Sequence, residues 1–498
     1  MKINYLKELR PYSFVELQSV FNKDEDETKE ILKSLSLKNM VRKLSKDTSE
    51  VELEDLLGTE NLEEINGLMD GNLYVFKYVG IVAIIDVCLI IYPKYINNFE
   101  EDKDNNFETI RQLISVIEKY KHKEQNVGLG SEFNKDNFNL LSLTLDLLSN
   151  YYEYGLYIND KQTIEQNGDG ESLWEKTINE SVAYISDDTP VYLDVFTQNQ
   201  ESNTQDYFTM LHLCILSEAC SRVKDILNIL GVTPVSLSQH QLDYFGSKEF
   251  ITYRLNQELS SQFITYKQKI LKLLRNYVQE DFSKKVSDKM SFIGTNSFNL
   301  VWENVCSVVF NNSKDKSLRE LGLDYSSSKR DSVILSKIIP KPKWMHADSK
   351  KCHYASKTLK PDIVKVSGKN ISIYDAKYYQ ITLNEVKVRN QPGVGDVTKQ
   401  YLYELAYMKF AEEKGLKFMR NAFLMPDNGD KALNIGTASF DIFEIDGIKF
   451  NEIEIYLLPH KKMYEYYLND DHVEDISEFF KWNVVSSPLT YSLQNGII

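Results

Sequence analysis

Residues 360–379, KPDIVKVSGKNISIYDAKYY, decide how the C-terminal part of this chain is interpreted. Two runs rich in β-branched and aromatic residues, PDIVKV and ISIYDAKYY, flank the polar sequence SGKN, a pattern typical of a β-hairpin. If Gly368 supplies the positive φ at the first central position of a two-residue turn, the register of the two strands is fixed. Counting outward from the turn, Asp362 is then predicted to lie opposite Asp375.

Three functional groups are expected to converge on this hairpin. Directly opposed residues of an antiparallel pair hold their Cβ atoms about 5 Å apart, and the two-residue period places Asp375 and Lys377 on one face. Two carboxylates this close repel each other unless a cation lies between them, and oxygen ligands of this kind suit Mg²⁺ or Mn²⁺. Such an ion polarises a phosphate oxygen and activates a water, while Lys377 can orient that water. The pattern therefore indicates hydrolysis of phosphodiester bonds.

The same residues resemble the PD-(D/E)xK nuclease superfamily, whose pattern is matched by Pro361, Asp362, Asp375 and Lys377. The resemblance implies a metal-dependent nuclease domain with a central mixed sheet. It also places Ala376, between the acid and the lysine, in the predicted metal-binding set. The alternative is a surface hairpin with solvated charges, because Asp and Lys are common on exposed edge strands.

Two further site residues follow from this resemblance. Superfamily members often carry an acidic residue on the helix before the hairpin, and residues 298–310 have helical spacing with Glu303 among them. Glu303 is therefore a candidate additional metal ligand. Some members carry Gln, with Tyr four residues later, on the helix after the hairpin. Gln400 is the matching catalytic candidate, although Glu404 occupies the later position here.

The helix that carries Gln400 is predicted from residue 397 through 407 and beyond. Asp396 is expected to cap its N-terminus, and Gly415 to end it. The side that carries Tyr401 and Leu405 is expected to pack on the sheet.

Length and composition indicate a protein of two or three domains, and its mixture of predicted strands and helices indicates the α+β class. The chain has 498 residues, 42% of them hydrophobic and 12% aromatic, enough for more than one core. Residues 1–50 are predicted to form a small helical module, with a winged-helix-like domain and a simple helical bundle both open. Residues 51–285 are predicted to form a strand and helix domain, and residues 286–498 the nuclease domain.

Within this division the individual elements are predicted from periodicity. Residues 5–45 indicate three short helices, and three strands follow between residues 73 and 92. The longest apolar run, residues 78–92, is interrupted by Asp86 and too short to span a membrane, so it is expected to form buried strands. Helices are predicted at residues 107–118, 138–152, 207–230 and 250–282.

The cysteines and histidines suggest no metal or nucleophile site of their own. The five cysteines are odd in number and lack Cys-x-x-Cys spacing, which is typical of reduced thiols in the cytoplasm. Cys352-His353 is a poor zinc pair without a second pair nearby. His212, in an apolar helical run, is expected to be a core residue. The chain opens without a secretory signal pattern, so we expect a cytoplasmic protein.

The charge distribution favours a nucleic-acid partner only locally. The net charge of −15 is unfavourable for DNA binding as a whole. Between residues 336 and 379, however, ten lysines stand against three aspartates, an excess of seven positive charges around the predicted site. Solvated surface lysines are the alternative interpretation.

Further strings extend the resemblance to restriction systems. YVGI at residues 78–81 and IIYPKY at residues 90–95 resemble the N-terminal region of McrC subunits. Residues 167–178, Trp302-Glu303 and residues 360–379 together resemble the LlaJI restriction endonuclease family. The resemblance spans roughly residues 70–460. It implies an anti-phage endonuclease subunit that cuts double-stranded DNA and works with a separate McrB-like AAA+ GTPase, on which its N-terminal part docks.

A partner is also expected because no Gly-x-x-x-x-Gly-Lys-Ser/Thr phosphate loop is found in the sequence. The only similar stretch, residues 393–396, lacks the lysine and the hydroxyl. Two other interpretations stay open at this point. One is a self-sufficient nuclease of the same superfamily without a motor, and the other is a non-enzymatic DNA-binding or adaptor subunit.

Overall fold

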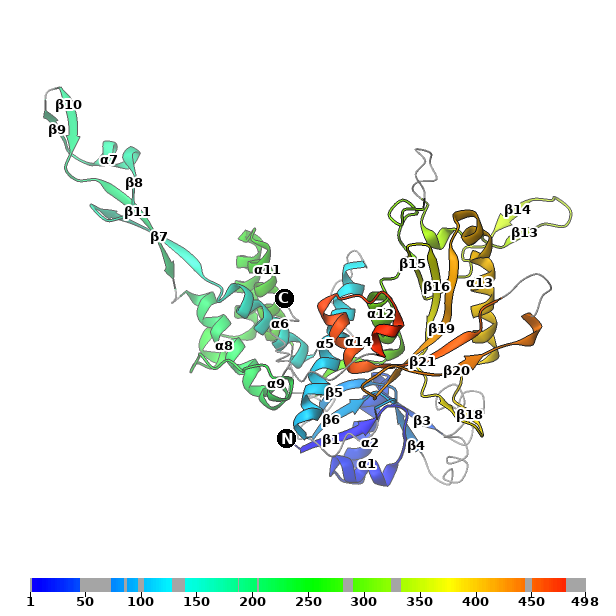
Figure 1. Ribbon diagram of the computed structural model, residues 1–498. Helices are drawn as coiled ribbons and strands as arrows, with labels where there is room; N and C mark the ends of the chain where they lie inside the picture. Colours follow the sequence, from blue (N-terminus) through cyan, green and yellow to red (C-terminus); the bar gives the residue numbers. More distant parts are fainter. Residues whose placement is uncertain are drawn as a thin grey trace. The chain divides into compact units, whose positions relative to one another are not determined.

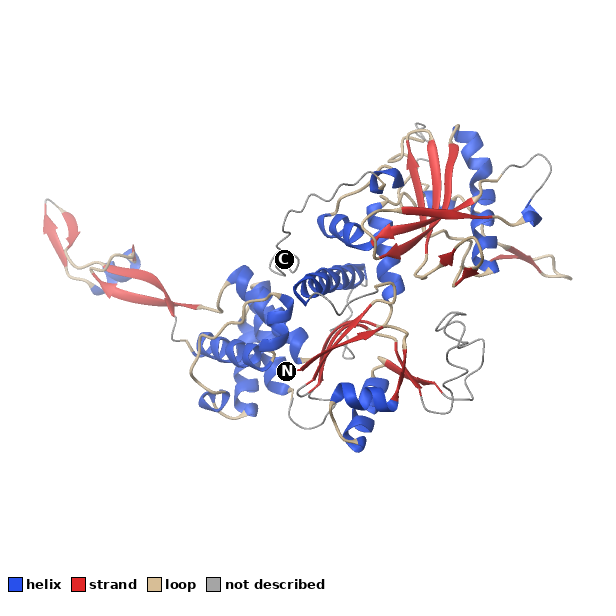
Figure 2. Ribbon diagram, turned by 60° about the horizontal axis from the view of Figure 1, so that its bottom comes forward, coloured by secondary structure: helices blue, strands red, loops and turns tan. Residues whose placement is uncertain are grey.

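The computed structural model describes residues 2–44, 73–84, 87–96, 103–127, 139–186, 188–203, 206–280, 290–323, 333–443 and 450–480. The expected α+β class is confirmed (Figures 1 and 2). The chain forms two compact units, one from Met1–Asp136 with Phe292–Ile497 and the other from Asn137–Ser291. The three-part division predicted from the sequence stays a prediction. Its boundaries near residues 50 and 285, like Asp86, lie outside the described residues.

A four-stranded sheet in the order β1-β6-β5-β12 forms the N-terminal part of the first unit. Its two central strands, β5 (Val79–Ile84) and β6 (Val87–Tyr92), are antiparallel and almost wholly buried, as their unbroken apolar runs predict. β1 (Lys2–Lys7) lies parallel to β6 at one edge, and β12 (Met290–Thr295) forms the other edge.

Two glycines allow β5 and β12 to approach closely. A Cβ atom at Gly80 would stand 2.1 Å from the main-chain oxygen of Ile293, and one at Gly294 would stand 2.2 Å from that of Val79. Gly80 also has a φ of +144° and Gly294 a φ of +155°, which other residues rarely adopt. The sheet therefore depends on the absence of a side chain at both positions.

A smaller sheet and two helices complete the N-terminal region. The sheet has the order β2-β4-β3, and its strands are β2 (Pro11–Ser13), β4 (Leu73–Phe76) and β3 (Val41–Leu44). Ser13 caps α1 (Phe14–Phe21), and Asp24 caps α2 (Glu25–Leu37).

Of the three short helices predicted between residues 5 and 45, two are confirmed as α1 and α2, and the first is wrong, because it falls on strand β1. On this edge strand only Leu6 is fully buried, so the sequence carries too little alternation to reveal a strand. A winged-helix-like module stays a prediction.

The C-terminal part of the first unit contains a five-stranded mixed sheet in the order β15-β16-β19-β21-β20. The three central strands are parallel, and both edge strands are antiparallel to their neighbours. The strands are β15 (Ile363–Ser367), β16 (Asn370–Ala376), β19 (Lys417–Asp427), β21 (Ile453–Pro459) and β20 (Leu433–Ala438). Two short hairpins lie outside this sheet, β13 (Lys343–Met345) with β14 (Cys352–Tyr354) and β17 (Thr382–Leu383) with β18 (Val388–Arg389).

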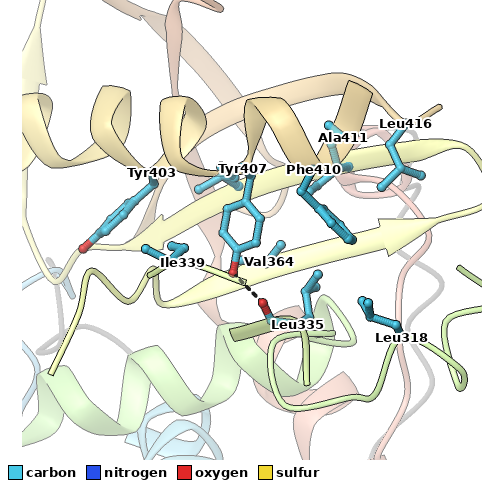
Figure 3. Packing of buried hydrophobic residues seen from close by; sticks show 11 residues of the cluster. Leu318, Leu335, Ile339, Val364, Tyr403, Tyr407, Phe410, Ala411 and Leu416 are labelled. Atoms are coloured by element: carbon cyan, nitrogen blue, oxygen red, sulfur yellow. Dashed lines mark hydrogen bonds between the residues drawn. The ribbon is translucent and has the colours of Figure 1, made fainter. Parts of the chain in front are cut away.

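Helices cover both faces of this sheet (Figure 1). α13 (Val394–Lys414) packs Tyr403, Tyr407 and Phe410 over Val364 and its neighbours, and the Tyr407 hydroxyl donates to the main-chain oxygen of Leu335 (Figure 3). On the other face α12 (Phe298–Val309) adjoins α14 (His460–Asn469) and the long α5 (Lys103–Val127). The indole of Trp302 on α12 donates to the main-chain oxygen of Leu424 at 3.0 Å.

Two details of α13 differ from the prediction. Gly393, not Asp396, is the N-cap residue, and Asp396 lies inside the first turn. Leu405 is 38% exposed, because the buried face of α13 runs through Gln400, Glu404 and Tyr407 instead. The predicted end at Gly415 is confirmed, with a left-handed φ of +63°.

The second unit combines helices with a thin ribbon. The helices are α6 (Leu140–Tyr154), α8 (Tyr207–Arg222), α9 (Lys224–Leu230), α10 (Lys248–Ser261) and α11 (Thr265–Gln279). Both long helices predicted here are broken in two. His212 is a buried core residue, as expected, and burial lowers its pKa to about 4.

The ribbon, which we call the arm, comprises residues 159–203 and extends away from these helices (Figures 1 and 2). Its long strands β7 (Asn159–Gln166) and β11 (Phe196–Asn203) are antiparallel. Between them lie β8 (Glu171–Ser172), α7 (Trp174–Glu180), β9 (Ala183–Ser186) and β10 (Thr189–Tyr192). None of the helices in the described ranges is long and apolar enough to cross a membrane.

We predict that Gly80→Ala destabilises the protein strongly. The added Cβ would collide with the main-chain oxygen of Ile293, and the cost of overpacking and of the unfavourable φ is about 3 kcal/mol. The midpoint of thermal unfolding should fall by several degrees. Gly395→Ala is the matched control, because nothing lies within 4 Å of its added Cβ and alanine suits a helix better than glycine. Equal midpoints for the two variants would contradict the close approach of the strands.

Candidate active site

The hairpin of β15 and β16 has the predicted turn and register. Gly368 has a φ of +57°, and Val366 pairs with Ile371 while Ile363 pairs with Tyr374. Asp362 directly precedes the paired residues, and its carboxyl lies close enough to that of Asp375 to raise the pKa of Asp375. The main-chain NH of Ala376 donates to the carboxylate of Asp362 at 3.3 Å, which draws that side chain toward the end of β16.

Lys377 lies beside both Asp375 and the first turn of α13. Its Nζ is 2.9 Å from Oδ2 of Asp375 and donates to Oδ1 of Asp396 at 3.0 Å. Burial alone would lower the pKa of Lys377, but the two carboxylates outweigh it and raise the pKa. The lysine is therefore firmly charged and held between two acids. Asp396, predicted as a helix cap, serves instead to position Lys377.

Asp375 is buried, and its surroundings disfavour the ionised form of its carboxyl. Burial raises the pKa of Asp375, and the facing carboxyl of Asp362 raises the pKa further, against the opposing effect of Lys377. The hydroxyl of Tyr403, on α13, shares this environment. Burial, followed by the charges of Asp375 and Asp362, raises the pKa of Tyr403 to about 12. A cation placed between the two acids would relieve their repulsion.

The segment after α12 holds Asp362 from the other side. The side-chain amide of Asn312 and the Nζ of Lys314 each donate to the main-chain oxygen of Asp362 at 2.8 Å. The oxygen of the same Asn312 amide accepts from the NH of Val364 at 3.1 Å. Burial and the neighbouring Lys360 lower the pKa of Lys314. Sequence reasoning missed both residues because their partner lies about fifty positions later in the chain.

Glu303 and Gln400 stand in different relations to the acid pair. Glu303 is half-buried on α12, and burial raises its pKa while the charges of Lys377 and Asp375 act on it in opposite directions. It is thus within electrostatic reach of the pair. The buried Gln400 donates through Nε2 to the main-chain oxygen of Ala422 on β19 at 3.2 Å. The catalytic or metal-binding role of each stays a prediction.

Glu404, at the position where the superfamily resemblance led us to look for tyrosine, forms a buried polar network. It accepts from the side-chain amides of Asn421 and Asn451, each at 2.9 Å. Burial raises the pKa of Glu404 while these donors oppose the rise. The network ties α13 to β19, the strand next to β16.

The donor set of this site fits a hard divalent cation. Mg²⁺ is usually held by one or two carboxylates together with water and substrate phosphates, and Asp362 and Asp375 provide that number of carboxylates. Within the described part of the chain, no three His, Cys, Asp or Glu side chains cluster closely enough to enclose a metal ion. A cation bound at this acid pair would take its remaining ligands from water or other oxygen donors. Main-chain coordination at Ala376 stays a prediction.

The model of the LlaJI restriction endonuclease family matches residues 78–456, more than half of the chain. This chain belongs to the LlaJI restriction endonuclease family. The matched LlaJI segment begins at the buried strands β5 and β6, includes the hairpin of β15 and β16, and ends in β21. The family resemblance expected from the sequence is thereby confirmed.

The chain is also similar to a curated restriction protein. The Type II restriction enzyme BsuMI component YdjA of Bacillus subtilis (strain 168) is 26% identical over 450 residues, covering 85% of this chain and 88% of that protein.

Two solved structures align with the chain at lower similarity. One is a chain from the assembly of Thermococcus gammatolerans McrB AAA+ hexamers with bound McrC, at 15% identity and a TM-score of 0.37, covering 94% of this chain and 100% of that chain. A second comes from the McrBC complex of the same organism, at 14% identity and a TM-score of 0.24, covering 61% and 86%. Both TM-scores are below 0.5, so these alignments do not establish a shared fold.

A buried polar cluster in this LlaJI-family chain joins the N-terminal region to the residue after Lys377. The Tyr378 hydroxyl donates to the carboxylate of Glu8, which also accepts from the main-chain NH of Lys94 at 3.2 Å. The ammonium group of Lys94 lies over the Tyr378 ring, 4.8 Å from its centre, and Tyr95 packs edge-on against the same ring. We call Glu8, Lys94, Tyr95 and Tyr378 the Glu8 cluster. Lys94 and Tyr95 belong to the IIYPKY string singled out in the sequence.

We predict that Glu8→Gln stabilises the protein as the pH rises. Burial raises the pKa of Glu8 above 4.5, the ordinary value, so the folded protein loses stability as the pH increases through that raised pKa. Glutamine keeps an acceptor for Tyr378 without the charge. The variant and the wild type should match below about pH 4.5, and the variant should then gain about 1.4 kcal/mol for each unit by which the pKa is raised.

The measurement is the thermal midpoint of both proteins between pH 4 and pH 8. Glu30→Gln, on the exposed face of α2, is the control, because its carboxyl is not buried. A difference between Glu8→Gln and wild type that stays constant over this range would contradict the burial of a charge at Glu8.

Proposed function

We propose that this protein is the DNA endonuclease subunit of a restriction system and hydrolyses phosphodiester bonds of double-stranded DNA with Mg²⁺ or Mn²⁺, in the manner of the PD-(D/E)xK superfamily. The observation that carries the proposal is the proximity of the Asp362 and Asp375 carboxyls at the end of the hairpin, with Nζ of Lys377 2.9 Å from Oδ2 of Asp375. Because the chain belongs to a family of restriction endonucleases, we infer that the substrate is DNA.

Each residue of the site has a role in this proposal. Asp362 and Asp375 would hold the divalent cation, with the main-chain oxygen of Ala376 as a further candidate ligand, while Glu303 would add negative charge nearby. The bound cation would polarise a phosphate oxygen and lower the pKa of a water. Lys377 would orient that water and offset charge that develops on the phosphate. Asp396 keeps Lys377 in place, and Gln400 supports the strand next to β16.

We predict that Asp375→Asn and Lys377→Met each lower the rate of DNA cleavage by about 100-fold or more. Each change removes a charge that the proposed transition state requires. Cleavage of plasmid DNA is measured with the protein purified together with its partner, with Mg²⁺, Mn²⁺, chelator and nucleotide varied separately. Asp430→Asn, at an exposed loop position, is the control and should cut as the wild type does. Undiminished cleavage by both site variants would contradict the site assignment. Wild-type activity of Asp362→Ala would favour a non-enzymatic adaptor role.

We further propose that a separate McrB-like AAA+ GTPase activates the nuclease. The strings at residues 78–81 and 90–95 support an McrC-like role, and the sequence contains no phosphate loop of its own. The arm supports a protein contact because it exposes apolar side chains on a ribbon too thin to bury them. Trp174, Val182 and Ile185 are 57%, 67% and 71% exposed.

We predict that the double variant Trp174→Ala and Ile185→Ser loses activation by the partner. Removing the apolar side chains should weaken co-purification with the motor subunit and abolish nucleotide-dependent cleavage, while the folded structure is retained. Val15→Ser with Leu37→Ser is the matched control, since both residues are exposed apolar side chains elsewhere in the chain. Specific cleavage by the purified chain with Mg²⁺ alone would instead show a self-sufficient nuclease.

A further inference from the structure

The hairpin of β13 and β14 buries none of its strand residues. Lys343 pairs with Tyr354, Trp344 with His353, and Met345 with Cys352, and all six residues are exposed. We call residues 341–357 the basic hairpin. Its base is fixed where the NH of Ala355 donates to Pro342 and the hydroxyl of Thr358 donates to Pro340. Figure 1 shows the basic hairpin projecting beyond the sheet that carries β15 and β16.

The tip of the basic hairpin is built as a compact turn around His346. Its Nδ1 accepts from the main-chain NH groups of Asp348 and Ser349 at 3.2 and 3.3 Å. Its main chain exchanges hydrogen bonds with Lys351 and Lys350. A preorganised tip loses little conformational freedom on binding, so it suits recognition of a ligand.

The basic hairpin exposes large apolar side chains to solvent. Trp344 and Tyr354 are each 68% exposed, and Met345 is 58% exposed. Because successive residues of a strand point to opposite faces, Trp344 lies on one face and Tyr354 with Met345 on the other. Exposed rings on a rigid two-stranded ribbon have no role in the core, which indicates a contact outside the chain.

The charge of the hairpin identifies the kind of partner. Six lysines against one aspartate lie between residues 340 and 360 in a chain of net charge −15, namely Lys341, Lys343, Lys350, Lys351, Lys357 and Lys360. Lysines in this number suit a polyanion, and a two-stranded ribbon fits the major groove of DNA. Aromatic and Met side chains among lysines can also pack against bases or enter a base step.

The basic hairpin is continuous with the candidate active site. Lys360 directly precedes Pro361 and Asp362 in the chain, and its charge acts on Lys314. Lys314 in turn contacts the main-chain oxygen of Asp362 at 2.8 Å. Positive charge therefore runs from the hairpin to the acid pair, which is where a bound DNA backbone has to lie.

We propose that the basic hairpin grips duplex DNA beside the bond to be cut, with its lysines on phosphates and with Trp344 and Tyr354 against the bases or sugars. This inference rests on the proposed nuclease function and adds a substrate-binding element to it. The lysine-rich stretch thereby binds the DNA backbone, which the negatively charged acid pair cannot do.

The test measures DNA binding separately from cutting. The full-length Asp375→Asn protein is titrated with a fluorescein-labelled duplex, and anisotropy is followed over a range of salt concentrations. Replacing Lys343, Lys350 and Lys351 by alanine should weaken binding and reduce the slope of log affinity against log salt by about 1 for each phosphate that is no longer neutralised. Trp344→Ala with Tyr354→Ala should weaken binding about fivefold or more without changing that slope.

Matched controls remove the same groups elsewhere. One control replaces by alanine three lysines that are exposed on helices, namely Lys33, Lys224 and Lys248. It deletes the same charge and should leave the salt slope unchanged. Phe263→Ala removes another exposed ring, 88% exposed, and should leave DNA affinity unchanged. Emission from Trp344, isolated by comparison with Trp344→Phe, should shift when duplex is added.

The outcomes separate this inference from the function on which it rests. If the wild type cuts DNA and the hairpin variants bind and cut as it does, the basic hairpin is not a DNA contact and the inference is overturned. Loss of partner binding with intact DNA binding would also overturn it, since the hairpin would then contact a protein. If the wild type neither cuts nor binds any duplex, the proposed function itself fails.

Discussion

The candidate site depends on the register of one hairpin, set by a two-residue turn at Gly368. Because the turn aligns the strands in this register, the carboxyls of Asp362 and Asp375 lie close together at the far end of the hairpin. A shift of one residue would turn every side chain of one strand to the other face of the sheet and separate them. The repulsion between them is the central electrostatic fact of the site. Lys377 offsets part of it, Asp396 anchors that lysine, and the remainder favours a cation.

Much of this geometry is local, and for that reason the sequence predicted it. Asp362, Asp375 and Lys377 lie within sixteen residues and belong to one hairpin, so turn chemistry and strand period suffice to bring them together. The contacts of Asn312, Lys314 and Glu8 were not predictable in this way. They join segments far apart in the chain, and nothing in a single sequence marks which distant segments meet. The same holds for strand β1, whose partner β6 is more than eighty residues away.

Local rules also failed where tertiary contacts competed with them. Asp396 is a residue type that commonly caps helices, yet its carboxylate is engaged by Lys377, and Gly393 is the N-cap of α13 instead. Leu405 fits the apolar period of the helix, but the buried face is wider and more polar, with Gln400 and Glu404 in it. Polar residues buried between a helix and a sheet hold the two elements in a defined position through hydrogen bonds. Hydrophobic periodicity alone does not identify such residues.

The order of strands along the chain has a consequence for synthesis. The N-terminal sheet takes β5 and β6 from residues before 93 and its edge strand β12 from residues after 289, with the whole second unit encoded in between. On the ribosome, β5 would wait with a bare hydrogen-bonding edge while roughly two hundred further residues are made, an interval of about 10–40 s at ordinary elongation rates. The apolar nascent sheet would be open to mispairing or chaperone capture for that time.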